Sequence, residues 1–530
     1  MMSDELALHR ELIDHLQHQL VQSHGRMVER IETHISSVLL AGDYAYKIKK
    51  PLDLGFLDFS TLQRRRFCCD EEIRLNRRLA PGIYIDVVPI TGSVQAPRLG
   101  GEGEAVEYAV RMRRFPDDAL LSSRPGTLDH GMARTIARVV AAFHAGIAVA
   151  QAETSFGEPE VLLQPMQANF DHIRQIMQEP SVLKRLAEIE RWTLDRFSTL
   201  RPLFETRKAE GFIRECHGDL HLGNIAWVDD APLIFDGIEF NPDLRWIDTF
   251  SELAFLLMDL DEKGRQDLSR LVLNHYLQVT GDFGGLPLLR FYQVYRAMVR
   301  AKVASIRLGQ EGLGVSEHSQ IMQEFSLYLS LAERYTHPGT PGIVITHGLS
   351  GSGKSTLAIQ VVQALGAVQL RSDVERKRLA GLTAVARTDA AISGGIYSGD
   401  FTRRTYERLA QLSELVVSSG FTAVVDATFL NGDQRLLFQG LSERLDLPYA
   451  LLDIQVHEDE LRRRVSQRVA EGSDPSEADI SVLESQLASY TPLAGEELNR
   501  VIAVSPEDKL WRDQLLERLG ISSNSVSSWE

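Results

Sequence analysis

Residues 348–355 read Gly-Leu-Ser-Gly-Ser-Gly-Lys-Ser and match the spacing G-x-x-x-x-G-K-[ST]. An apolar run precedes them, and a helical pattern begins at Thr356. In such a loop, backbone N–H groups surround phosphate oxygens, the Lys354 ammonium neutralises phosphate charge and the Ser355 hydroxyl binds Mg²⁺. The alternative, a Gly/Ser turn with an accidental lysine, does not explain this context. The expected nucleotide-binding residues are Gly348, Gly351, Ser352, Gly353, Lys354, Ser355 and Thr356.

The sequence around this loop has the order of a parallel α/β sheet. Four apolar segments alternate with amphipathic helical patterns. They lie at 343–346, 368–371, 423–425 and 450–456. Strands that alternate with helices form parallel sheets covered on both faces. We therefore expect a P-loop domain of the AAA type from 343 to 530, after a Pro- and Gly-rich linker at 337–342.

Charged side chains follow two of these strands. Asp373 and Arg376 come after the second strand, and Asp426 ends the third. Open α/β sheets bind ligands at the carboxyl ends of their strands. We expect Asp373 to orient or deprotonate an acceptor hydroxyl, Arg376 to bind an anionic substrate group, and Asp426 to hold Mg²⁺. Helix capping by the aspartates and a solvated helix face are the alternatives.

A predicted helix farther on carries Arg464 and Arg468, four residues apart on one face. The segment that follows contains Asp474-Pro475-Ser476-Glu477, which has the form of a helix start with a capping box. A basic helix, a hinge and a second helix are typical of a lid whose arginines close over the transferring phosphate. Exposed arginines in salt bridges are the alternative.

Three motifs of this region resemble those of P-loop kinases related to polynucleotide kinase and zeta-toxin proteins. They are Ser372-Asp373, Asp426-Ala427-Thr428 and Asp474-Pro475-Ser476-Glu477-Ala478. The resemblance covers about 340–510 and implies an ATP-dependent kinase domain. It does not identify the acceptor of the phosphoryl group.

A second constellation lies in the first two-thirds of the chain. Residues 217–224 read His-Gly-Asp-Leu-His-Leu-Gly-Asn, with the Asp-to-Asn spacing of a phosphotransferase catalytic loop. In that template Asp219 accepts the proton of the acceptor hydroxyl and Asn224 holds Mg²⁺. A predicted hairpin with strands at 225–228 and 233–235 then delivers Asp236, which matches the second metal-binding carboxylate.

An upstream strand supplies the expected nucleotide lysine. Strand alternation places Lys47 and Lys49 on the same face. We prefer Lys47 for the α/β-phosphate contact, with Lys49 as its rival, and Glu72 as the ion-pair partner, with Glu71 as its rival. Each residue alone also suits a turn or a surface charge. Their order along the chain favours a kinase-like fold.

The surrounding pattern predicts a bilobal, protein-kinase-like N-terminal domain over 1–336. Strand patterns occur at 36–40, 44–48, 83–89 and 107–113, with a helix from about 60 to 79 between the second and third. After Phe115 the pattern is mainly helical. We expect a small β-rich lobe at about 28–115 and a helical lobe at about 116–336.

The His-Gly-Asp form of 217–219 and the later Asp248 resemble the aminoglycoside phosphotransferase and choline kinase group, over about 30–330. The sequence has no G-x-G-x-x-G before the lysine strand, which suits this group better than eukaryotic-type protein kinases. The stretch 46–62 further resembles bacterial proteins that fuse such a domain to a P-loop kinase. The resemblance implies the fold, and it does not make an antibiotic the substrate.

Composition excludes several other classes. The formal net charge of -16 argues against general nucleic-acid binding. Three cysteines, Cys68, Cys69 and Cys216, are too few for a disulfide framework. The polar N-terminus and the absence of a long apolar run predict a cytoplasmic protein without membrane contact. The oligomeric state stays open.

These patterns together predict a bifunctional kinase. Each domain is expected to bind ATP and Mg²⁺ and to transfer the γ-phosphoryl to a hydroxyl of a small-molecule or nucleotide acceptor. In the alternative, one domain alone is catalytic and the other is an ATP-binding regulatory or ATPase module.

Overall fold

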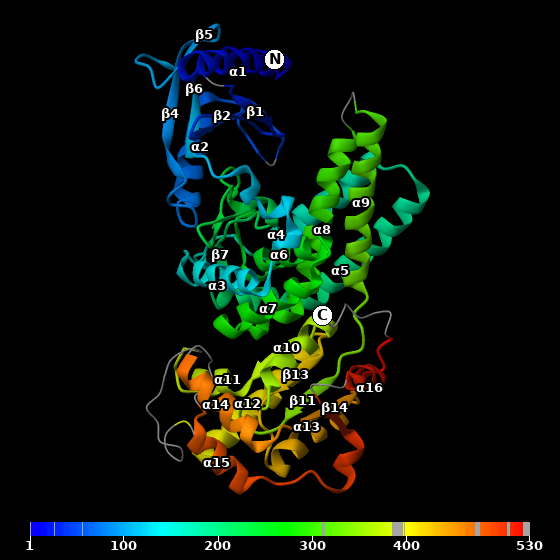
Figure 1. The fold of residues 1–530 in the computed structure, drawn as a ribbon. Coiled ribbons are helices and arrows are strands. Elements are labelled where there is room, and N and C mark those ends of the chain that lie inside the picture. The colour runs from blue at the N-terminus through cyan, green and yellow to red at the C-terminus, as the bar shows by residue number, and fades with distance from the viewer. Residues whose placement is uncertain are drawn as a thin grey trace. The chain divides into compact units, whose positions relative to one another are not determined.

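The computed structural model describes residues 2–25, 27–55, 57–309, 313–383, 396, 398–471, 478–505 and 509–522 (Figure 1). The chain packs as two compact units. The first contains Met1–Leu128, Ala142–Ala168 and Ser198–Asp259, and the second contains Asp129–Ala141, Asn169–Phe197 and Leu260–Glu530. A packing unit can cut across a domain, so the domain boundaries expected from the sequence stay a prediction.

The first unit contains a six-stranded antiparallel sheet in the order β1-β2-β3-β6-β4-β5. Its strands are β1 (Glu29–Glu32), β2 (Ser36–Ala41), β3 (Tyr44–Lys49), β4 (Tyr84–Ser93), β5 (Ala96–Leu99) and β6 (Ala105–Arg113). Helix α1 (Met2–His24) packs on one face and helix α2 (Leu62–Asn76) on the other, because Ala109 belongs to the core under α1 and its neighbour Val110 to the core under α2 (Figure 1). The Thr61 side chain caps α2 by accepting from the Arg64 N–H at 3.2 Å.

The remaining elements of the kinase-like part are mainly helical, as expected. The helices are α3 (His130–Gly146), α4 (Pro159–Ile176), α5 (Pro180–Ala209), α6 (Thr249–Glu262), α7 (Gln266–Thr280), α8 (Leu286–Leu308) and α9 (Val315–Thr336). Short strands β7 (Ile213–Glu215) and β10 (Trp246–Asp248) pair with each other, and β8 (Ile225–Val228) pairs with β9 (Ala231–Ile234). β9 begins two residues before the strand expected at 233–235. The reason is that Asp229 and Asp230, with φ of 50° and 59°, close the hairpin in two residues.

The second unit contains a five-stranded parallel sheet in the order β12-β13-β11-β14-β15. Its strands are β11 (Ile343–His347), β12 (Val368–Arg371), β13 (Ala423–Asp426), β14 (Tyr449–Ile454) and β15 (Val501–Val504). The helices after β11 are α10 (Lys354–Leu365), α11 (Ser372–Leu379), α12 (Gly399–Ser418), α13 (Gly432–Arg444), α14 (Glu458–Glu471), α15 (Ile480–Ser489) and α16 (Leu510–Leu519). Val344, Val424 and Leu452 of the sheet share a buried core with α10 and α16. The parallel sheet expected from the alternating pattern is confirmed.

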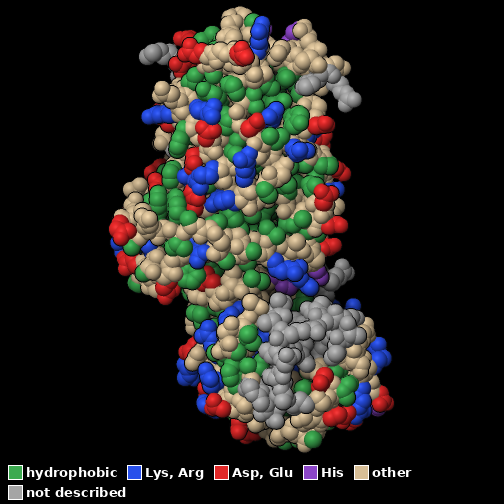
Figure 2. All heavy atoms as spheres, turned by 90° about the vertical axis from the view of Figure 1, so that its left-hand side faces the viewer, with side chains coloured by type: hydrophobic (Ala, Val, Ile, Leu, Met, Phe, Trp, Pro, Cys, Tyr) green, Lys and Arg blue, Asp and Glu red, His purple; other side chains and the backbone are tan. Residues whose placement is uncertain are grey.

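The surface carries no marked segregation of charge on the face drawn in Figure 2, where acidic and basic side chains are interspersed. Within the described ranges, we find no helix with both the length and the apolar character needed to cross a membrane.

Candidate functional sites

The Lys47 side chain lies on the face of strand β3 that packs against helix α2. Lys47 lies opposite Val110 in the sheet, and Val110 belongs to the core on the α2 face. The Lys47 Nζ donates to Glu72 Oε1 at 2.9 Å and also to an Asp236 carboxylate oxygen. The structure therefore brings together the expected lysine, glutamate and second aspartate, which are separated by up to 189 positions in the chain.

The charges of this cluster stabilise one another. Burial opposes ionisation of Glu72, but the Lys47 and Lys49 ammonium groups outweigh it and lower the pKa of that carboxyl to about 2. Burial likewise disfavours the charged form of Lys47, yet Asp236 and Glu72 raise its pKa well above the ordinary value. Both groups are therefore charged at neutral pH.

The rival residues have other partners. Lys49 is completely buried, and its Nζ donates to Glu72 Oε2 at 2.7 Å and to Glu239. Glu71 instead accepts from the Arg74 guanidinium at 2.8 Å. Lys47 and Glu72 thus lie together with Asp236, whereas Lys49 also contacts the buried Glu239. The choice of Lys47 and Glu72 for the nucleotide site stays a prediction.

The catalytic loop places Asp219 beside Asn224. The Asn224 Nδ2 donates to the Asp219 backbone oxygen at 2.9 Å and to Asp219 Oδ2 at 3.1 Å. Gly218 has φ of +86°, and a Cβ there would lie 2.8 Å from the Leu244 oxygen, so the position before Asp219 requires glycine. His217 Nε2 lies 2.9 Å from the Phe235 oxygen, which ties the loop to the residue before Asp236.

The sequence analysis missed one residue that holds this loop. Glu252 of α6 is buried and accepts the Gly218 N–H at 2.7 Å, while its other oxygen lies 3.0 Å from His144 Nε2. The ligand-type atoms of His144, Cys216 and Glu252 lie within 4.8 Å of one another. Both carboxylate oxygens already have hydrogen-bond partners, so we interpret the group as an anchor for the loop. No local pattern marks Glu252, because its contact spans 34 residues.

The Asp236 side chain is 44% exposed. Its φ is +64°, its N–H donates to the Tyr84 hydroxyl at 3.1 Å, and the Gly237 N–H donates to Asn76 Oδ1 at 2.8 Å. The Asn224 amide donates through Nδ2, which leaves its oxygen as the atom suited to a cation. A carboxylate and an amide oxygen are donors that Mg²⁺ accepts, so the residues fit this ion.

Asp248, part of the resemblance to aminoglycoside phosphotransferases, has a structural contact. Its carboxylate accepts from the buried Arg207 guanidinium at 2.6 and 2.9 Å and from the Phe250 N–H at 2.8 Å. This bidentate pair fixes the start of α6, the helix that carries Glu252.

The phosphate loop follows β11 and opens α10. Gly348, Gly351 and Gly353 have φ of +147°, +85° and +96°. A Cβ on Gly348 would lie 2.9 Å from the Ile454 oxygen, and a Cβ on Gly351 would lie 3.0 Å from Val465 Cγ2. The loop therefore depends on glycine for both backbone conformation and space.

The phosphate loop carries an ammonium, a hydroxyl and backbone N–H groups, which are groups that bind phosphate. Lys354 Nζ donates to the Leu349 oxygen at 2.8 Å, which keeps the ammonium over the loop. The buried Ser352 hydroxyl has no hydrogen-bond partner among the described residues. The Ser350 N–H donates to Gln486 Oε1 of α15 at 2.9 Å, a contact that sequence reasoning missed. Thr356 lies in the first turn of α10, as expected.

Asp426 lies next to Ser355 at the carboxyl end of β13. Gln369 Nε2 donates to Asp426 Oδ2 at 3.0 Å, and Arg371 Nε lies 3.5 Å from the same oxygen. The Ser355 hydroxyl is close enough to lower the pKa of the carboxyl. Burial raises the pKa of Asp426, and Arg371 opposes that shift. A serine hydroxyl and a carboxylate beside a phosphate loop fit Mg²⁺.

The expected acceptor residues lie on α11. Asp373 is close enough to Asp426 to contribute to its raised pKa. Arg376 is buried, and its Nη1 donates to the Ile396 oxygen at 2.8 Å and to Thr402 Oγ1 at 3.0 Å. In this structure its guanidinium therefore binds groups of the protein itself, and substrate binding by Arg376 stays a prediction.

Part of the expected lid is described. Arg464 of α14 pairs with Glu460 at 2.7 Å, and a Cβ on Gly353 would lie 3.8 Å from its Nη1, so the guanidinium borders the phosphate loop. The Arg468 side chain and the helix start expected at 474–477 lie outside the described residues.

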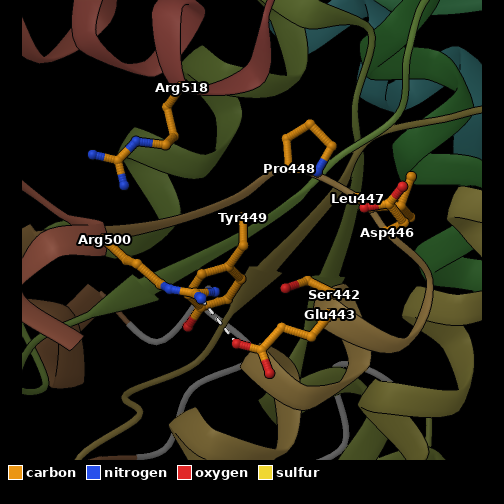
Figure 3. Close-up of a pocket in the computed structure, with 8 residues that line it drawn as sticks. All are labelled: Ser442, Glu443, Asp446, Leu447, Pro448, Tyr449, Arg500 and Arg518. Atoms are coloured by element: carbon orange, nitrogen blue, oxygen red, sulfur yellow. Dashed lines mark hydrogen bonds and ion pairs between the residues drawn. The ribbon is translucent and has the colours of Figure 1, made fainter. Parts of the chain in front are cut away.

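A separate pocket of about 300 Å³ lies at the amino end of β14 (Figure 3). The phosphate loop instead follows the carboxyl end of β11. In the pocket, Arg500 Nη2 donates to Glu443 Oε1 at 2.8 Å, so these two opposite charges of the lining neutralise each other. The lining residues are Ser442, Glu443, Asp446, Leu447, Pro448, Tyr449, Arg500 and Arg518.

Comparison with known proteins identifies a domain family and relatives of the chain. Residues 343–493 match the family model described as an AAA domain. The uncharacterized protein Rv2004c of Mycobacterium tuberculosis is 32% identical over 407 residues, which cover 76% of this chain and 78% of that protein. The chain belongs to the same family. The uncharacterized protein Mb2027c of Mycobacterium bovis matches to the same extent.

Solved structures match the chain over part of its length. A choline/ethanolamine kinase family protein of Mesorhizobium loti has a TM-score of 0.37 and 12% identity, over 61% of this chain and 99% of its own. A gluconokinase of Sinorhizobium meliloti 1021 has a TM-score of 0.24 and 22% identity, over 34% of this chain and 91% of its own. At these scores the likeness does not identify a substrate. The expected fusion of a kinase-like part with a P-loop kinase-type part is confirmed, since the AAA match covers β11 to α15 and the Lys47–Glu72–Asp236 cluster precedes it.

Proposed function

We propose that the protein is a bifunctional ATP-dependent phosphotransferase, with one active site at Asp219 and the other at the phosphate loop. Each site transfers the γ-phosphoryl of ATP to a hydroxyl group of a small-molecule or nucleotide acceptor. The observation that carries the proposal is the Lys47 Nζ, which bonds to both Glu72 and Asp236 beside the Asp219 loop. That arrangement joins a phosphate clamp to a metal-binding carboxylate.

In the N-terminal site, each side chain has a role that its position supports. Lys47, charged and oriented by Glu72, binds the α/β-phosphates. Asp219 accepts the proton of the attacking hydroxyl, and its contact with Asn224 Nδ2 orients the carboxylate. Asn224 and Asp236 hold Mg²⁺. That ion, when bound with ATP, neutralises charge on the β- and γ-phosphates.

In the C-terminal site, the glycine loop and Lys354 bind the β/γ-phosphates, and Ser355 with Asp426 holds Mg²⁺. Arg464, beside Gly353, stabilises charge on the transferring group. Asp373 orients the acceptor hydroxyl, and Arg376 binds an anionic group of the acceptor once released from Thr402. Catalysis in both sites comes from alignment and charge stabilisation, without a covalent protein intermediate.

The test uses the full-length protein in three forms: Asp219→Asn, Lys354→Ala and the double variant. Each is incubated with ATP, Mg²⁺ and a metabolite and nucleotide library, and phosphorylated products are detected by mass spectrometry. We expect the wild-type protein to make two sets of acceptor-dependent products. Asp219→Asn abolishes one set, Lys354→Ala abolishes the other, and the double variant makes neither.

Other results favour the alternative function. If Lys354→Ala abolishes ATP consumption that no acceptor stimulates, the P-loop domain is an ATPase module. If either variant leaves every product unchanged, the corresponding domain is not catalytic and bifunctionality is wrong.

A further inference from the structure

Helix α7 takes the place of a neighbouring strand at the edge of the parallel sheet. β12 is an edge strand. The Gln369 N–H donates to Asn274 Oδ1 at 2.6 Å, and Asn274 Nδ2 donates to the Ala367 oxygen at 3.0 Å. One amide side chain of α7 thus satisfies a donor and an acceptor that an edge strand leaves unpaired.

A second amide of α7 connects this edge to the phosphate site. Gln278 Nε2 donates to Gln369 Oε1 at 3.1 Å, and Gln369 Nε2 donates to Asp426 Oδ2 at 3.0 Å. Because the Gln369 oxygen accepts from Gln278, the NH₂ end of the same amide must face Asp426. Gln369 is 4% exposed and Asp426 is 6% exposed, so little solvent is available to replace this donor.

Two further bonds of α7 lead away from the carboxylate. Arg270 Nη1 donates to the Gln363 and Ala364 oxygens at the end of α10, the latter at 2.9 Å. Arg378 Nη2 donates to the Gln278 oxygen at 2.7 Å. These bonds hold α7 in place, whereas the two glutamines form a direct path from α7 to Asp426.

We propose that Gln369, oriented by Gln278, is a positioning residue for the Mg²⁺-binding carboxylate Asp426, so that helix α7 sets the metal affinity of the P-loop site. The proposal rests on the proposed nucleotide-binding function of that site. A partner that orients a metal ligand without touching the metal typically changes metal affinity about 10- to 100-fold. Helix α7 precedes the linker at 337–342, so the effect comes from the part of the chain expected to form the kinase-like domain.

The experiment measures metal and nucleotide affinity separately in the full-length protein. The double variant Lys47→Met/Asp236→Ala serves as the background, because it removes the proposed phosphate-binding lysine and a proposed metal ligand from the N-terminal site. Mn²⁺ affinity with ADP present is measured by electron paramagnetic resonance, and ADP affinity without metal by calorimetry. We expect Gln369→Met to weaken Mn²⁺ binding about tenfold and to leave metal-free ADP binding unchanged.

Gln278→Ala should weaken Mn²⁺ binding in the same direction. Combining it with Gln369→Met should add nothing, because both substitutions break one path. Arg270→Ala is the matched control: it removes a contact of α7 that does not reach Asp426, so it should lower thermal stability and leave Mn²⁺ affinity unchanged.

Two results overturn the proposal. One is unchanged Mn²⁺ affinity in Gln369→Met. The other is an equal loss in Arg270→Ala, which would mean that α7 acts through stability alone. A failure of the proposed nucleotide-binding function would give another result: the background protein would bind no ADP.

Discussion

At the scale of single residues, two lysines of one strand both bind Glu72 but differ in their second partner. Lys47 also meets Asp236, whose side chain is 44% exposed, whereas Lys49 meets Glu239, which is buried. A buried charge that loses its partner destabilises the fold strongly. We therefore propose a structural role for Lys49 and a nucleotide-binding role for Lys47.

Lys49→Met should lower the free energy of unfolding by about 3–5 kcal/mol, because Glu239 would remain buried without its ammonium partner. Lys47→Met should cost less stability, since Glu72 keeps Lys49, but it should lower the turnover of the N-terminal site by about 100-fold or more. The free energy of unfolding from urea denaturation and the rate of ADP formation, measured for each variant, check these predictions. The reverse ranking would contradict these assignments.

The sequence predicted which residues of the N-terminal site converge, because phosphoryl transfer needs a lysine, a base and metal ligands in a set order. It could not choose between Lys47 and Lys49, since alternation puts both on one face. Glu252 and Gln369 were not predicted. Their contacts with Gly218 and Asp426 span 34 and 57 residues, and no local pattern encodes contacts of that length.

At the scale of elements, the strands and helices that carry chemistry were the easiest to predict. β11, β12 and β13 begin where their apolar runs begin, whereas α1, β1, β5 and β15 were missed. β1 is a polar edge strand, Glu-Arg-Ile-Glu, and lacks the alternation that marks a half-buried strand. Helix α1 is also polar on average, and its apolar stripe of Leu12, Leu16 and Leu20 becomes a core only when it packs on the sheet.

Packing of α1 should depend on pH through His9. Burial, assisted by Arg65, lowers the pKa of His9 to about 4. The unfolded chain therefore binds more protons than the folded chain between about pH 6.5 and pH 4, and the stability contributed by neutral His9 is lost as the pH falls through this range. Urea midpoints at pH 7 and pH 5 should differ less in His9→Asn than in the wild type. An equal difference would rule out this role.

The phosphate loop should not tolerate a side chain at Gly351. A Cβ there would crowd Val465 and the Leu461 oxygen at a φ of +85°, so Gly351→Ala should strain the loop by about 1–2 kcal/mol and weaken ATP binding about tenfold. Gly440→Ala is the control, because its Cβ meets nothing within 4 Å on helix α13, where alanine is favoured. Calorimetric ATP titration should separate the two variants, and equal affinities would contradict the proposed loop geometry.

At the scale of the whole molecule, one chain carries two separate sets of residues that we propose to bind phosphate. The Lys47 set lies in the first compact unit and the Lys354 set in the second. The alternative with one catalytic domain still predicts two bound nucleotides per chain. The number of nucleotides bound therefore does not show which domain is catalytic.

Calorimetry with ADP and Mg²⁺ should therefore give two ADP molecules per chain in the wild type. Lys47→Met and Lys354→Ala should each give one, and at 100 times the dissociation constant each occupied site should stabilise the fold by about 2.7 kcal/mol. A single binding event that survives one of the two substitutions would show that the corresponding pocket does not bind nucleotide.

The bond between Lys47 and Asp236 has a consequence for the order of events in the N-terminal site. The Lys47 ammonium group neutralises the Asp236 carboxylate, which we propose as a ligand of Mg²⁺. Mg²⁺ without nucleotide would therefore compete with the Lys47 ammonium for Asp236. Phosphate oxygens that draw Lys47 towards themselves would release Asp236, so we expect the nucleotide to bind before Mg²⁺ or together with it.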